Sequence, residues 1–446
     1  MSAPVAVVPA LVPPLTPARR PAKLTVAERV LPTGLRVLVV RRATVPLVEV
    51  RLRVPFAGRS ASHSAKASVL GETLLSGTAD LTTVDIAVAL QEIGGSLSVS
   101  ADPDRLLLSG NGLASGLPRL LEILADVLTG AAYPAEEVTG ERDRLVERLR
   151  MARSQPGVIA REALLGRMYG DHPYAHEIPE ADAVAAVTPA QLRSLHRSRV
   201  IPAGSTLVIV GDVSPQRALD RVETALADWD GGTAARGAPR LPALEAGPIV
   251  LVDRPGAVQS NIRVGGHALS RQDPQYPAMQ LANLVYGGYF SSRLVENVRE
   301  EKGYSYSPHS VIEHSAAGSA LVMEADVATE VTAPALLEMR YELGRMATLP
   351  VAAQELDSAR QYAIGTLALS IATQAGLAST ITALLASGVD VDWLREHTTR
   401  LGAVTIADVQ EQAARHLAPS ALATVVVGDA AAVGFPLSTL DEVSTG

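Results

Sequence analysis

The sequence predicts an α+β protein made of two similar halves, each a sheet with helices packed on it. Three observations predict this fold class: a segment of the first half recurs in the second, strand-like runs open each half, and amphipathic helical segments follow them. The chain has 446 residues, of which 47% are hydrophobic and 19% charged. That is enough apolar material for a large core in more than one domain.

The internal repeat is the first of these observations. Thr188 begins a helical pattern that leads to a strand at 207–211, and Thr405 begins another that leads to a strand at 425–428. The two segments align without a gap at one offset of about 217 residues. Duplication is the simplest account. The alternative is coincidence, because a helix capped by Thr before a buried strand is a common unit.

Strands and helices follow in the same order in both halves. Strand-like runs occur at 35–40, 48–54, 249–252 and 260–264, and apolar residues at helical spacing occur at 117–129, 136–151 and 333–347. The Gly- and Pro-rich stretch after the first copy of the repeat is typical of a linker. We expect a flexible leader, a first domain, a linker, a second domain and a tail, at 1–22, 23–230, 231–248, 249–436 and 437–446.

Composition excludes several classes of partner. The net charge of −8 provides no basic surface for nucleic acid or an anionic membrane. The absence of cysteine excludes disulfides, thiolate nucleophiles and cysteine-based metal sites. No apolar run reaches the roughly 18 to 20 residues that cross a bilayer. We expect a cytoplasmic protein with neither nucleic acid nor membrane as partner, and the preference for arginine over lysine is typical of a GC-rich bacterial genome.

The usual hydrolase motifs are missing from the sequence. There is no Gly-x-Ser-x-Gly elbow and no P-loop. His172 and His176 are four residues apart, but Pro173 breaks the helix that would bring them together. A surface loop is the better interpretation of this pair than a metal site.

One segment, 287–306, does carry residues suited to a binding site. A glycine pair is followed by Ser-Ser, a natural helix start, and then by a helix that ends at Gly303 after a basic last turn. Arg299 near the helix end and Tyr306 just inside the following strand could point into one cleft, as a guanidinium fork and a phenol donor. The alternative is that Arg299 only caps the helix and Tyr306 only packs at a sheet edge.

Several short motifs occur along the chain in a fixed order, namely Leu31-Pro-Thr-Gly-Leu-Arg-Val37, Ile93-Gly-Gly95, His172-Pro-Tyr174, Ser291-Ser-Arg293-Leu, Val298-Arg299-Glu and Gly303 with Tyr306. Their order and spacing resemble the pitrilysin or insulinase family of inverted zinc peptidases, from about Leu31 to Gly428. The resemblance implies two homologous α/β-roll domains, each a mostly antiparallel sheet covered by helices on one side.

Active members of that family carry His-x-x-Glu-His and a further zinc-binding Glu in a later helix. The matching positions here hold Ser68 and Glu72 in place of the histidines, Gly71 in place of the general base, and Arg148 in place of the last ligand. A shift of one residue would put Glu147 there instead. The resemblance therefore implies that this chain binds no metal, because one surviving carboxylate cannot hold catalytic zinc.

The family includes enzymes in which one subunit keeps the zinc motif and its partner keeps only the second-domain Arg and Tyr. By that resemblance Arg299 would hold the substrate backbone and Tyr306 would donate a hydrogen bond to the developing oxyanion. The implied partner is a homologous subunit with intact His-x-x-Glu-His and zinc, the complex a heterodimer that hydrolyses peptides or matures precursors. This chain would be inactive alone. The alternatives are a structural scaffold like the core proteins of respiratory complexes, and a peptide-binding protein without proteolysis.

Overall fold

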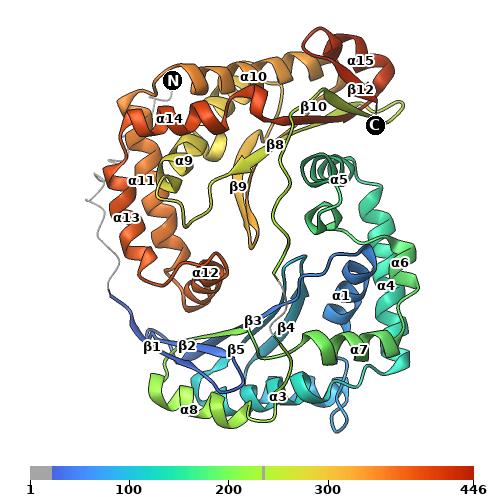
Figure 1. Cartoon of the computed structure of the whole chain (residues 1–446), viewed down its shortest axis with the longest axis vertical. Helices are drawn as coiled ribbons and strands as arrows, with labels where there is room; N and C mark the ends of the chain where they lie inside the picture. The colour runs from blue at the N-terminus through green and yellow to red at the C-terminus, as the bar shows by residue number, and fades with distance from the viewer. Residues whose placement is uncertain (1–22, 234–236, 446) are drawn as a thin grey trace, which may run out of the picture.

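Two six-stranded sheets organise the structure, a computed structural model that describes residues 23–233 and 237–445. One sheet lies in each half of the elongated molecule (Figure 1). The leader expected at 1–22 lies outside the described residues. The fold class expected from the sequence, an α+β protein with one mostly antiparallel sheet in each half, is confirmed.

The first sheet has the spatial order β1-β2-β6-β3-β5-β4. Its strands are β1 (Thr25–Val30), β2 (Arg36–Arg41), β3 (Leu47–Pro55), β4 (Ser96–Ala101), β5 (Arg105–Leu113) and β6 (Thr206–Gly211). Neighbouring strands pair antiparallel except for β2 with β6, which are parallel. β4 is therefore a free edge of this sheet.

The second sheet repeats this plan with the order β12-β7-β11-β8-β10-β9. Its strands are β7 (Ile249–Asp253), β8 (Gln259–Ala268), β9 (His309–Ser315), β10 (Gly318–Ala328), β11 (Ala423–Gly428) and β12 (Val443–Thr445). β7 pairs parallel with both β11 and β12, and the other pairs are antiparallel. The sequence assigns 437–446 to a tail, whereas β12 places part of that segment in the sheet.

Helices connect the strands in the same manner in both halves. The first half contains α1 (Ala61–Thr73), α2 (Thr83–Glu92), α3 (Leu117–Gly130), α4 (Ala135–Arg153), α5 (Pro156–Tyr169), α6 (Ala181–Ala185), α7 (Pro189–Arg199) and α8 (Pro215–Ala225). The second contains α9 (Tyr276–Asn283), α10 (Thr332–Thr348), α11 (Ala353–Ser370), α12 (Gln374–Ala386), α13 (Trp393–Ala403), α14 (Ile406–His416) and α15 (Ala430–Ser438). The expected helices at 117–129, 136–151 and 333–347 correspond to α3, α4 and α10.

The repeat found in the sequence has the same local structure in both copies. Thr188 caps α7 and Thr405 caps α14, each in a capping box in which the Thr hydroxyl accepts a bond from the backbone three residues later. The strand after each helix, β6 or β11, lies inside its sheet and not at an edge. The two copies thus occupy equivalent places in the two halves.

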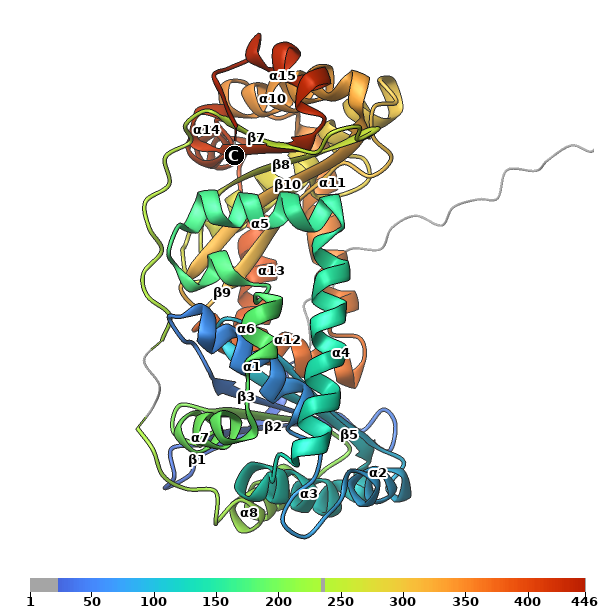
Figure 2. The ribbon, with the colours of Figure 1, turned by 90° about the vertical axis from the view of Figure 1, so that its right-hand side faces the viewer.

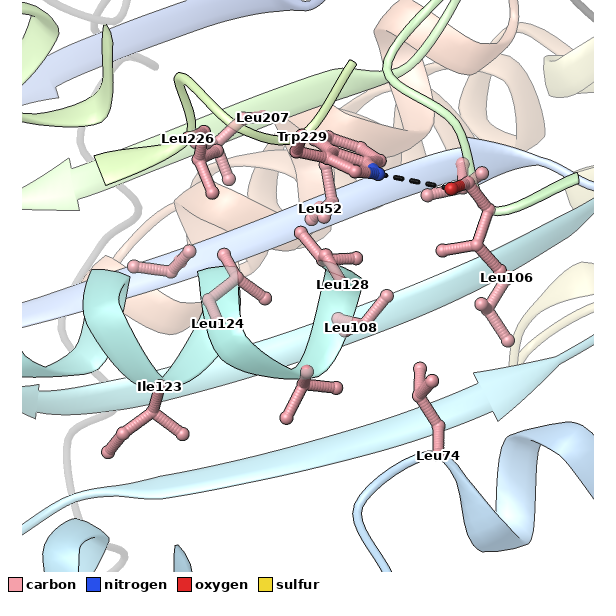
Figure 3. Packing of buried hydrophobic residues seen from close by; sticks show 14 of the residues in the cluster. Leu52, Leu74, Leu106, Leu108, Ile123, Leu124, Leu128, Leu207, Leu226 and Trp229 are labelled. Atoms are coloured by element: carbon pink, nitrogen blue, oxygen red, sulfur yellow. Dashed lines mark hydrogen bonds between the residues drawn. The ribbon is translucent and has the colours of Figure 1, made fainter. Parts of the chain in front are cut away.

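The first half has a continuous hydrophobic core between its sheet and its own helices. Leucines from β3 and β5 face leucines from α3, as Figure 3 shows for Leu52, Leu108 and Leu124. Trp229 closes one end of this core, and its indole Nε1 donates a hydrogen bond to the carbonyl of Val200 at 3.0 Å. A buried indole N–H usually has such a partner, because an unpaired donor is costly.

The other face of each sheet is covered by a helix from the opposite half. α5, from the first half, packs on β8 and β11, and α12, from the second half, packs on β3 and β6. Figures 1 and 2 show α5 beside the second sheet, and Figure 1 shows α12 beside the first. Two further hydrophobic clusters, one around α5 and one around α12, form in this way. The two halves therefore share their cores.

Within the described residues, no single helix is both long and apolar enough to cross a bilayer. α11 and α12 would satisfy such a test only as a pair, and they meet at an angle of 111°.

Candidate functional site

The positions of the expected zinc motif lie on α1. The Ser68 hydroxyl donates a hydrogen bond to the carbonyl of Ser64 at 3.0 Å, within its own helix. Gly71 is buried, and a β-carbon there would contact Ala101 at the end of β4 at 3.5 Å. None of these groups presents a lone pair suited to a transition metal in place of imidazole.

Glu72 and Arg148 meet in this structure. Arg148 Nη2 on α4 is 2.7 Å from Glu72 Oε1 on α1, so the surviving carboxylate is occupied by a guanidinium. Glu147, the alternative last ligand, pairs instead with Arg150 one turn along α4, and its side chain is 68% exposed. The structure thus brings together Glu72 and Arg148, and not Glu72 and Glu147.

Zinc does not fit this arrangement. A catalytic site needs three neutral or anionic ligands around the metal, and here a fixed positive charge stands beside the one carboxylate. Across residues 23–233 and 237–445, no cluster of three or more His, Asp or Glu side chains is arranged to hold a metal ion. His172 and His176 are likewise not part of any such cluster.

His172 and Tyr174 have structural contacts. His172 Nδ1 accepts a hydrogen bond from the backbone N–H of Tyr174, and its Nε2 lies 3.1 Å from the carbonyl of Pro239. The Tyr174 hydroxyl donates to Asp104 Oδ1 at 2.6 Å and accepts from the N–H of Ala317 in the second half. The His-Pro-Tyr motif therefore joins the two halves.

Arg299 and Tyr306 lie together, as the sequence suggests. The Arg299 guanidinium carbon lies 4.9 Å from the centroid of the Tyr306 ring. It lies at the same distance, 4.9 Å, from the centroid of the Phe290 ring. Such spacing is typical of cation–π contacts. Tyr306 is 83% exposed and Phe290 64% exposed, so the cluster faces solvent. Phe290 and Tyr306 can contact another molecule, whereas Arg299 Nε pairs with the exposed Glu300 next to it, 3.2 Å from Oε1.

The local backbone around Arg299 differs from the expectation in three ways. The helix at Val295–Glu301 is a π-helix, and a second one covers Leu284–Gly288. Ser292 makes no capping bond, and its hydroxyl is buried without a partner. Tyr306 lies in the loop before β9, not inside the strand. Only Gly303, with φ of +65°, ends the helix as predicted.

π-helices are frequent at functional sites, where the extra residue per turn redirects a side chain. Sequence periodicity provides no signal for them, which is why the standard helix was expected. Phe290 was missed for a related reason, since its contact with Arg299 depends on this local geometry.

Ion pairs fix the segment that carries Arg299. Arg293 binds Glu355 on α11 through two bonds, Nε to Oε1 at 2.6 Å and Nη2 to Oε2 at 2.8 Å. The Arg293 guanidinium lowers the pKa of the Glu355 carboxyl, since it bonds to the charged form. Asn297 donates to Glu338 and to the buried Glu342 on α10. The Arg of the Ser-Ser-Arg-Leu motif is thus an anchor for the segment, and Arg299 is partly exposed with Glu300 as its ion-pair partner.

The two sets of residues belong to different halves of the chain. Among the described residues, no hydrogen bond, ion pair or ring contact joins the Ser68–Arg148 group to the Arg299–Tyr306 group. Duplicated domains of this topology, with a zinc-motif helix in the first and an Arg/Tyr segment in the second, define a peptidase-like chain. Its described zinc-motif positions do not fit a metal ion.

The comparisons with known proteins agree with this class. The model of insulinase (peptidase family M16) matches residues 67–182, and that of the peptidase M16 inactive domain matches 186–362, so the two cover well over half of the chain. The chain belongs to the M16 peptidase family. The first match contains the Ser68 and Arg148 positions, and the second contains Arg299 and Tyr306.

The chain is also similar to bacterial proteins of this family and to solved structures. An uncharacterized zinc protease of Mycobacterium tuberculosis is 29% identical over 314 residues, 67% of this chain and 70% of the relative. A probable inactive metalloprotease of Bacillus subtilis is 28% identical over 211 residues, 45% of this chain and 48% of the relative. A peptidase M16 inactive domain from Pseudomonas fluorescens shares the fold with a TM-score of 0.85 at 22% identity, over 91% of this chain and 98% of that one.

Proposed function

We propose that this chain is the non-catalytic subunit of a two-component zinc metallopeptidase. Its partner is a homologous subunit with an intact His-x-x-Glu-His motif and zinc. The observation that carries the proposal is a contrast within one chain. The zinc-motif positions are closed by the Glu72–Arg148 pair, whereas Arg299 and Tyr306 lie together, with Tyr306 83% exposed and the Arg299 side chain 30% exposed.

In the complex, Arg299 and Tyr306 act on peptide that is bound by the partner. The Arg299 guanidinium offers a planar fork of donors to the carbonyl groups of the peptide backbone. The Tyr306 phenol donates a hydrogen bond to the carbonyl oxygen that gains negative charge during hydrolysis. The anchored segment supports these roles, because Arg293 and Asn297 hold the helix while Arg299 stays at the surface.

Two substitutions test this assignment in the mixed complex. Arg299→Ala and Tyr306→Phe should each lower peptide turnover by at least about tenfold, because each removes a donor to the reacting peptide. Both side chains are at the surface, so the melting temperature and the association with the partner should stay unchanged.

Tyr304→Phe is the matched control, since Tyr304 lies in the same loop and packs against the core of the second half. Turnover by this variant should equal that of the wild type. Equal turnover by the Arg299 and Tyr306 variants as well would refute the assignment and leave a scaffold role for the chain.

A further inference from the structure

A cavity of about 480 Å³ lies between the two halves and is open to solvent on one side. Its wall combines apolar side chains, such as Leu165 and Ile312, with four arginines. These are Arg53, Arg105, Arg161 and Arg271, of which Arg105 pairs with Asp102 at 2.8 Å. Neither the zinc-motif positions nor Arg299 and Tyr306 line it. It is therefore separate from the groups to which the proposed function assigns roles.

The cavity occurs where the two halves depart from their common plan. Arg53 on β3 stands opposite Thr206 on β6, and the equivalent place in the second sheet, opposite Ala423 on β11, is Gly265. A β-carbon on Gly265 would lie 2.6 Å from the sulfur of Met168, so α5 packs directly on the sheet there. In the first half an arginine replaces that glycine, and α12 presents the small side chains Ala383 and Ala386 to the cavity.

Arg53 forms no ion pair with any described residue, although Asp104 and Asp102 lie near enough to attract its charge. No hydrogen bond or ion pair within the described ranges reaches its guanidinium, and its Nε is buried without a partner. Burial lowers the pKa of Arg53, and the nearby carboxylates of Asp104 and Asp102 offset this effect only in part. Its neighbour Arg51, two residues away on β3, pairs with Glu49 at 2.9 Å. The same strand thus holds one arginine with an ion pair and one without.

Arg271 is the second arginine of the wall without a carboxylate partner. Its Nη1 donates one long hydrogen bond, 3.3 Å, to the hydroxyl of Ser387, and it forms no ion pair with any carboxylate of the described chain. Guanidinium groups in such surroundings gain most from a carboxylate ligand, which can accept two of their parallel N–H donors.

The carboxylates of the wall are already engaged. Arg161 binds Glu177 through Nε at 2.7 Å and Glu313 through Nη1 at 3.0 Å. Asp104 accepts from the Tyr174 hydroxyl through Oδ1 and from the N–H of Ala316 through Oδ2. Asp102 accepts from Arg105 Nε through Oδ2 at 2.8 Å. The negative charge of these four carboxylates disfavours more than one added carboxylate in the cavity.

Two free strand edges end at this cavity. β4, an edge of the first sheet, leads directly into Asp102, which lines the wall. β9, an edge of the second sheet, contributes Ile312 and Ser315 to the wall. An extended peptide paired with either edge would therefore deliver its next side chain into the cavity.

We propose that this cavity binds one carboxylate side chain of an extended peptide, and that Arg53 and Arg271 receive it. The inference rests on the proposed function for the choice of a peptide as ligand. The binding step itself belongs to this chain alone and needs no zinc subunit. It gives the complex a preference for peptides with an acidic residue.

Fluorescence anisotropy of a labelled unstructured peptide with the full chain tests the proposal. A peptide with glutamates should bind about tenfold tighter than the same peptide with glutamines, because one charge-assisted contact distinguishes them. Arg53→Gln and Arg271→Gln should each abolish this preference. Arg53→Gln should not lower the melting temperature, since it removes an unpaired buried charge.

Arg217→Gln on the exposed face of α8 is the control and should keep the preference. An excess of free N-acetylglutamate should compete only weakly, because it lacks the backbone contacts of the peptide. Equal affinity for both peptides, or a preference that survives in Arg53→Gln, would overturn the proposal. Either result leaves the proposed function untouched, since turnover in the mixed complex depends on Arg299 and Tyr306.

Discussion

Arg148 Nη2 and Glu72 Oε1 lie 2.7 Å apart, at two positions where active relatives of this architecture are expected to bind zinc. The side chains are 57% and 38% exposed, so the pair contributes little to stability. Its effect is chemical, because a guanidinium occupies the one remaining carboxylate. The pair thus joins α1 and α4, the two helices that carry the zinc-motif positions.

Restoring the motif on α1 alone should fail to restore zinc binding. We expect the triple variant Ser68→His, Gly71→Glu and Glu72→His to bind no zinc after dialysis, because Arg148 would still oppose the cation. Metal content per chain, measured by mass spectrometry of the purified variant, checks this.

Adding Arg148→Glu to the triple variant should produce one bound zinc per chain. Adding Glu147→Gln instead is the matched control and should have no effect, since Glu147 pairs with Arg150 away from α1. Zinc uptake by the triple variant alone would show that Arg148 is not the position of the last ligand.

The two capping threonines should contribute equally to stability. Thr188→Ala and Thr405→Ala each remove the side-chain acceptor of a capping box, and each should lower the free energy of unfolding by about 1 kcal/mol. Thr399→Ala, on the exposed side of α13, should change it little. Urea denaturation measures all three, and a cost at only one of the two caps would argue against the equivalence of the repeats.

Buried histidines should make the protein acid-sensitive. Burial, with a smaller contribution from nearby arginines, lowers the pKa of His314 and of His397 to about 3 from the usual 6.5. Between these values the unfolded chain binds protons that the folded chain does not. The free energy of unfolding should therefore fall as the pH drops below about 6.5, by up to about 1.4 kcal/mol per pH unit for each histidine.

The variant His397→Gln tests this pH dependence. Its urea midpoint should fall less steeply between pH 6.5 and pH 4.5 than that of the wild type, because one titrating group is gone. The exposed His176→Gln should behave as the wild type. Parallel curves for His397→Gln and the wild type would assign the acid sensitivity to other groups.

Much of the fold could be predicted from local signals. Thr188 and Thr405 mark helix starts by capping chemistry, and the apolar runs that follow them mark buried strands. The exchange of α5 and α12 between the halves could not be predicted, because it depends on packing between residues far apart in the sequence. The apolar faces of these two helices do not indicate which sheet they cover.

The candidate site also has parts that could be predicted from the sequence and parts that could not. Motif spacing predicted Arg299 near Tyr306, and the structure brings this pair together. The resemblance gave Glu72 and Arg148 only as zinc-motif positions, and their contact is seen in the structure alone. The π-helix at Val295–Glu301 and the contact of Phe290 with Arg299 depend on backbone geometry, which a sequence does not display. The buried Arg53 Nε without a hydrogen-bond partner could not be predicted either, because it depends on which side chains lie nearby in the fold.

The most direct test of the central claim is peptidase activity on a quenched unstructured peptide. Three samples are assayed. They are the chain alone, the chain mixed with an equimolar zinc-motif homologue from the same source, and the same mixture after treatment with a chelator. We expect the mixture to cleave the peptide faster than the homologue alone does. The chelator should remove this activity. Activity of the homologue that this chain leaves unchanged would contradict the account.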